Sequence, residues 1–159
     1  PVSLLDAYPT ILSLAGATPV AEDAGKPGRS LLEIADGAYP DRTVLGEYHA
    51  VASTTGIFMI RFWHYKYIHY EGERPQLFDL AADPMETRDL ALEPGNEGIL
   101  AEGDRRLREI CDPTAVNARA FANQAARVAE FGGEEKVRAM GSYPYTPAPG
   151  EKPRISGAG

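Results

Sequence analysis

Glu47 and His49 are the side chains whose types and spacing best fit a binding site. They lie two residues apart at the end of a predicted strand, so they share a face, just before a loop of small residues at 50–56. Side chains at strand ends and in the following loops can reach a cleft. Because an imidazole can donate to an anion or titrate near neutral pH, we expect His49, with Glu47 beside it, to contact a substrate. The alternative is a histidine at a sheet edge and a solvated or salt-bridged carboxylate.

Cys111 superficially resembles the nucleophile of a Cys-Pro-Ser/Thr motif. The next position of that motif is Arg, whereas Ala115 stands here, and Asp112 with Pro113 is typical of a helix start. We therefore interpret Cys111 as a structural or exposed thiol and assign no catalytic residue in this chain.

The remaining candidates also favour structure over chemistry. His64 and His69 are five residues apart and would face opposite sides of a regular strand, so they predict no metal site. The aromatic residues within 58–70 alternate with β-branched neighbours, which is typical of a half-buried sheet. A stacking platform for bases or sugars is the less favoured alternative.

The composition is that of one ordinary globular domain and argues against two kinds of partner. The chain has 159 residues, 23 of them acidic and 16 basic, which gives a net charge of −7. This charge has the wrong sign for nucleic acid or an anionic membrane surface. No apolar run approaches the ~20 residues of a membrane span, so we expect a soluble protein. Because Pro1 opens directly into an apolar stretch without an initiator Met, we expect a piece of a longer chain.

A small antiparallel sheet must position Glu47 and His49. Strand-forming residues begin at Arg42, and we expect a hairpin of 57–62 against 65–70 followed by a strand at 76–80. A short buried helix is predicted within the apolar stretch 2–15, capped by Asp6 and ending at Gly16, and further helices are predicted at 30–35, 96–110, 113–131 and 134–140. The predicted fold class is α+β: a sheet of three to four strands packed by helices, then a helical C-terminal extension and an irregular tail from Ser142.

Two local patterns add detail. In the segment 77–90, Asp83 before Pro84 predicts a capped turn, with Glu86 at capping-box spacing. In the helix at 113–131, one side can dock on another domain or subunit because apolar residues recur at Phe121, Ala125 and Val128.

Several segments together resemble the C-terminal part of type I sulfatases, members of the alkaline phosphatase superfamily. The most specific is Leu77-Phe78-Asp79-Leu80 followed by Asp83-Pro84, Glu86 and Asp89-Leu90. The others, in the order that family uses, are the opening Val2–Leu12 with Leu14-Ala15-Gly16, Gly28–Leu32, Glu47-Tyr48-His49, Met59-Ile60-Arg61 and Tyr65–Ile68. The region after Asp112 looks like the extensions of bacterial sulfatases related to choline sulfatase and phosphonate monoester hydrolases. This resemblance implies a bacterial protein, cytoplasmic or periplasmic.

The resemblance implies a parent enzyme that hydrolyses a small sulfate ester with a formylglycine residue and a divalent cation, usually calcium. The segments that carry those groups in the family precede the point corresponding to Pro1, so we expect the chain alone to be inactive and to hold no metal. It also implies three parts: 1–36 as the end of the catalytic α/β domain, 37–111 as the antiparallel-sheet subdomain, and 112–159 as a helical extension and tail. The upstream catalytic domain is then the main partner, together with further copies in a homo-oligomer.

Two other functions stay open at this point. The chain can be a non-catalytic binding or oligomerisation module, for which the Ala-rich helix and the Pro-rich tail are the evidence. Its parent can also be a phosphonate or phosphodiester hydrolase of the same superfamily.

Overall fold

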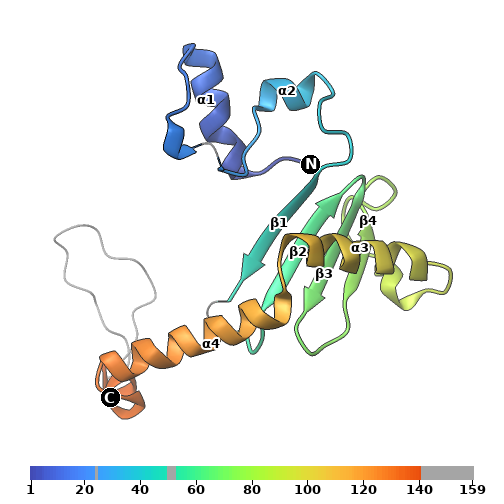
Figure 1. Cartoon of the computed structure of the whole chain (residues 1–159). Coiled ribbons are helices and arrows are strands. Elements are labelled where there is room, and N and C mark those ends of the chain that lie inside the picture. Colours follow the sequence, from blue (N-terminus) through green and yellow to red (C-terminus); the bar gives the residue numbers. More distant parts are fainter. Residues whose placement is uncertain (24, 50–52, 141–159) are drawn as a thin grey trace. The chain divides into compact units, whose positions relative to one another are not determined.

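The computed structural model describes residues 1–23, 25–49 and 53–140, coloured along the chain in Figure 1. Residues 50–52 of the predicted loop and the predicted tail from Ser142 lie outside the described residues. Internal contacts divide the chain into two compact units, Pro1–Asn117 and Ala118–Gly159. The three-part division drawn from the resemblance stays a prediction.

The described part of the chain contains a four-stranded antiparallel sheet, which confirms the α+β class. Its strands follow chain order: β1 (Thr43–Tyr48), β2 (Ile57–Phe62), β3 (Tyr65–Tyr70) and β4 (Gln76–Asp79). Phe62 pairs with Tyr65, so β2 and β3 form the predicted hairpin around Trp63 and His64. The prediction for β4 extended one residue too far.

One face of the sheet carries the hydrophobic core. Alternating residues of β2, Phe58, Ile60 and Phe62, are fully buried there, and Tyr67 on β3 is 2% exposed. The core interpretation is thus confirmed for three of the six aromatic residues, whereas Trp63 in the turn is 43% exposed. Helix α3 (Glu97–Ile110) lies across the sheet (Figure 1). It contributes the fully buried Leu107 to this face.

The opposite face of the sheet is less covered. Val44, Ile57, Met59 and Ile68 stand on it and are partly exposed. An antiparallel sheet with one such face is normal in a small domain, although an apolar face of this kind usually meets another surface.

The first helical segment differs from its prediction in two ways. It consists of a 3₁₀ turn, η1 (Leu4–Asp6), and helix α1 (Ala7–Ala15), and the helix is not buried: Ile11 is 63% exposed and Leu14 is 70% exposed. Asp6 does not cap α1, because its carboxylate is used by Arg42 and by the backbone N–H groups of Ser3 and Arg29. Sequence periodicity shows that apolar side chains lie together, but not which surface covers them.

The other helices agree with the sequence to within about one residue at each end. They are α2 (Leu31–Ala35), α3, α4 (Pro113–Glu130) and α5 (Glu134–Ala139). The start of α4 is as predicted: Pro113 is its first residue, and the Asp112 carboxylate accepts from the backbone N–H of Ala115 at 3.2 Å.

The turn after β4 is partly as expected. Asp83 Oδ2 accepts from the backbone N–H of Arg88 at 2.8 Å, so the capped turn is correct. The capping-box role for Glu86 is wrong: no helix begins at Asp83, since the next helical turn is the 3₁₀ segment Leu90–Leu92, and the Glu86 carboxylate binds Lys66 Nζ at 2.6 Å. Glu86 has the spacing of a capping residue, but the fold places its carboxylate beside Lys66 on β3, and it binds this partner instead.

Candidate functional site at the end of the sheet

Glu47 and His49 contact each other, as their spacing requires. His49 Nε2 lies 3.2 Å from Glu47 Oε2, with Glu47 exposed and His49 half-buried. The His49 ring packs edge-on against Phe58, with ring centroids 5.2 Å apart. One side of the imidazole therefore rests on the core, while its Nε2 edge faces the carboxylate.

A second histidine–carboxylate pair lies on the same face, and sequence reasoning missed it. His69 Nε2 lies 3.1 Å from Glu71 Oε2, and the His69 ring centroid is 6.1 Å from that of Phe58. The strand register could have revealed this second pair, because Phe58 is paired with Glu47 on β1 and with His69 on β3. The two pairs flank one aromatic ring; we call Glu47, His49, Phe58, His69 and Glu71 the histidine end of the sheet.

The start of α4 supports the histidine end. Thr114 Oγ1 donates to Glu71 Oε1 at 2.8 Å. The hydrogen bond from His69, followed by that from Thr114, lowers the pKa of Glu71, which keeps its carboxylate charged near neutral pH.

Position 56 requires glycine because the side chains of His49, Phe58 and Asn117 lie close to its backbone. Its N–H donates to Asn117 Oδ1 at 2.8 Å. A Cβ at this position would lie 3.0 Å from each of three atoms, in His49, Phe58 and Asn117. The backbone at Gly56, just before β2, thus lies close to His49, to Phe58 and to Asn117 of α4.

Cys111 lies near this end, at the C-terminus of α3, and is half-buried. Burial, and then the negative charges of Glu47 and Asp112, raise the pKa of its thiol. Because the thiolate is the nucleophilic form, this environment suits a structural cysteine.

The described residues offer no site for a divalent cation. Within 1–23, 25–49 and 53–140, no group of three or more His, Cys, Asp or Glu side chains is arranged to hold a metal ion. His64 and His69 contact different carboxylates. His64 lies in the β2–β3 turn, with Nε2 3.7 Å from Asp79 Oδ2, whereas His69 contacts Glu71. The calcium that the resemblance implies therefore does not fit this part of the structure.

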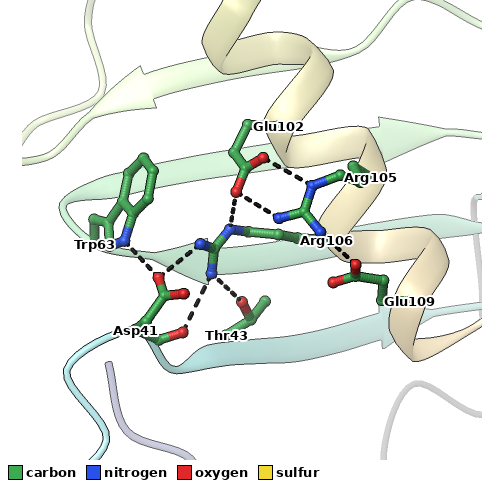
Figure 2. A network of polar contacts seen from close by, with 7 residues as sticks. All are labelled: Asp41, Thr43, Trp63, Glu102, Arg105, Arg106 and Glu109. Carbon is green, nitrogen blue, oxygen red and sulfur yellow. Dashed lines mark hydrogen bonds and ion pairs between the residues drawn. The ribbon is translucent and has the colours of Figure 1, made fainter.

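A polar network at the other end of the sheet holds α3 in place (Figure 2). The buried Arg106 donates to Asp41 Oδ1 at 2.6 Å, to Glu102 Oε1 at 2.6 Å and to Thr43 Oγ1 at 3.0 Å. Its guanidinium also lies over the Trp63 ring, 4.8 Å from the centroid. With these donors engaged, Arg106 acts as a structural residue.

Two surface cavities lie away from the histidine end. The larger, about 670 Å³, is lined by η1, α1 and α2 together with Lys26, Arg29 and Tyr39, and the smaller, about 430 Å³, adjoins it near Arg42. Glu47 and His49 line neither of them.

Comparison with solved structures defines the class of protein. The chain resembles the structure of a 2-O GAG sulfatase with a TM-score of 0.55 and 35% sequence identity, covering 66% of this chain and 23% of that one. No protein-family model matches the chain.

Curated relatives point to the same class. The chain is 33% identical over 156 residues to choline-sulfatase of Rhizobium meliloti (strain 1021), covering 96% of this chain and 30% of the relative. It is 35% identical over 126 residues to arylsulfatase K of Danio rerio, covering 74% of this chain and 23% of the relative. The chain is thus related to the sulfatases, a class of hydrolases, and its partial coverage fits a C-terminal part. It spans less than a third of the length of these relatives.

No helix of the described residues is long and apolar enough to cross a bilayer.

Proposed function

We propose that this chain is the C-terminal subdomain of a sulfuric ester hydrolase, and that it packs on the catalytic domain and helps to form the wall of the substrate cleft. The observation that carries the proposal is the similarity to choline-sulfatase along 96% of the chain. The formylglycine and the divalent cation of the enzyme belong, on this proposal, to the part of the protein outside these residues.

The histidine end is the part of the subdomain we assign to the cleft. His49 is oriented by Glu47 and by Phe58, and an imidazole held this way presents a donor or a positive charge to an anionic ester. In this role His49 and Glu47 bind and orient the substrate, while bond cleavage takes place on groups of the catalytic domain.

Exposed apolar side chains on η1 and α1 support the packing part of the proposal. Leu4, Ile11 and Leu14 are each more than half exposed. Apolar residues gathered at this density on one segment usually meet another protein surface.

The full-length gene product tests the proposal. We expect it to hydrolyse an aryl sulfate in a reaction that a chelator abolishes, and the 159-residue chain alone to show neither turnover nor tight calcium binding. Sulfate esters should be preferred to phosphonate monoesters and phosphodiesters; the reverse preference would identify the parent as a different hydrolase. A full-length product with no ester hydrolase activity would favour a binding or oligomerisation module.

A further inference from the structure

Arg61 is a cation without a partner in the described part of the chain. It lies on β2, it is half-buried, and its Nε atom is buried with no hydrogen-bond acceptor among the described residues. Buried polar atoms of native proteins are nearly always hydrogen-bonded, and a guanidinium offers five N–H donors. An acceptor for Arg61 is therefore missing from this part of the structure.

The neighbours of Arg61 in the sheet do not supply that acceptor. Arg61 is paired with Val44 on β1 and with Lys66 on β3. Lys66 is itself a cation, and the Glu86 carboxylate, 2.6 Å away, binds it. Two cations thus stand opposite each other on one face, and only Lys66 has its anion.

The surroundings of Arg61 show which kind of surface is missing. On the same face Val44, Ile57, Met59 and Ile68 are partly exposed, whereas the α3 face is closed by buried side chains. A partly exposed apolar face with one unpaired guanidinium fits a covering surface that is apolar and carries a carboxylate, because a charge that becomes buried needs an opposite charge.

We propose that this sheet face docks on the part of the sulfatase chain outside these 159 residues, and that a carboxylate of that part binds Arg61. This inference rests on the proposed function. The relatives are more than three times as long as the matched segment, so a large partner surface is present in a protein of their size. A second copy suits the face less well, because the Glu86 carboxylate that it would bring already binds Lys66.

The test uses the full-length gene product with Arg61→Met, which keeps an apolar stem and removes the charge. An unpaired buried carboxylate should loosen the docked subdomain, so we expect limited proteolysis to be faster by about tenfold or more. Arg61→Lys should recover part of the loss. The matched control is Arg74→Met, which removes an exposed ion pair with Asp89 and should change the rate by less than about twofold.

A crystal structure of the wild-type full-length product gives an independent reading. We expect an Arg61 guanidinium nitrogen within hydrogen-bond distance of a carboxylate outside the 159 residues. Two outcomes would overturn this inference alone, provided that the product hydrolyses sulfate esters. One is an Arg61 that faces water or a second copy. The other is equal proteolysis of the Arg61→Met and Arg74→Met variants. Absence of sulfatase activity in the wild-type product would overturn the proposed function, and this inference with it.

Discussion

The Asp6 carboxylate is fully buried and binds the Arg42 guanidinium through two hydrogen bonds, from Nη1 to Oδ2 at 2.8 Å and from Nη2 to Oδ1 at 2.6 Å. The backbone N–H groups of Ser3 and Arg29 donate to the same carboxylate. This contact links η1 to the residue before β1. Removing one partner of such a buried bidentate pair leaves the other charge unpaired and lowers the unfolding free energy by about 3–5 kcal/mol.

Acid should weaken the fold through this pair. The hydrogen bond from Arg42 lowers the pKa of Asp6 from 3.8 to about 2, against the opposing effect of burial. A lowered folded-state pKa means that the stabilisation is present above about pH 4 and is lost as the pH falls towards 2, a change of roughly 2 kcal/mol. Urea melts at several pH values measure it. Asp6→Asn should lower the stability at neutral pH and flatten the acid dependence, whereas Asp36→Asn, at the exposed end of α2, should leave that dependence unchanged.

Gly103 should be intolerant of any side chain. A Cβ there would lie 2.7 Å from Cγ of Tyr67, because α3 packs directly on β3 at this point. We expect Gly103→Ala to cost about 1–3 kcal/mol of unfolding free energy. Gly98→Ala in the same helix meets no atom within 4 Å and should be neutral or stabilising. Similar urea midpoints for the two variants would contradict the close packing.

Phe78 tests the burial of the last strand. It is 6% exposed, so Phe78→Ala should lower the unfolding free energy by about 3–5 kcal/mol. The same substitution at Phe121, which is 47% exposed, should cost less than about 1 kcal/mol. Chemical denaturation of both variants gives the comparison, and a Phe78→Ala protein as stable as the wild type would show that the Phe78 side chain is not buried.

His49 tests the proposed contribution to the cleft. In the full-length enzyme, His49→Ala should raise KM or change the leaving-group preference, with a loss of about 1–3 kcal/mol in kcat/KM. His64→Ala, in the β2–β3 turn, is the control and should leave the kinetics unchanged. Wild-type kcat/KM with every sulfate ester tested would reduce His49 to a histidine at the sheet edge. A fall in kcat of about four orders of magnitude at constant KM would instead make it a proton-transfer residue.

Phe121 tests the predicted contact of α4 with another subunit or domain. We expect Phe121→Asp to move the full-length protein to a later elution volume on size exclusion, with an unchanged circular dichroism spectrum. Arg119→Asp, on the same helix, controls for a new charge. An elution volume equal to that of the wild type would leave the homo-oligomer without support from this helix.

Local chemistry determined most of the secondary structure. Alternating aromatic and β-branched residues around a two-residue turn predict the β2–β3 hairpin, and Asp112 with Pro113 predicts the start of α4, because each signal acts within a few residues along the chain. The contact between Glu47 and His49 was predictable for the same reason: side chains two apart on a strand share a face.

Tertiary structure decided which partner each polar side chain takes. Asp6 has the residue type of a cap and instead binds Arg42, and Glu86 binds Lys66, because these partners lie far along the chain and are brought close only by folding. The same holds for the second pair, His69 and Glu71, whose position beside Phe58 follows from strand register. Burial of α1 was predicted wrongly because periodicity measures how apolar residues are arranged, whereas burial depends on the surface that meets them.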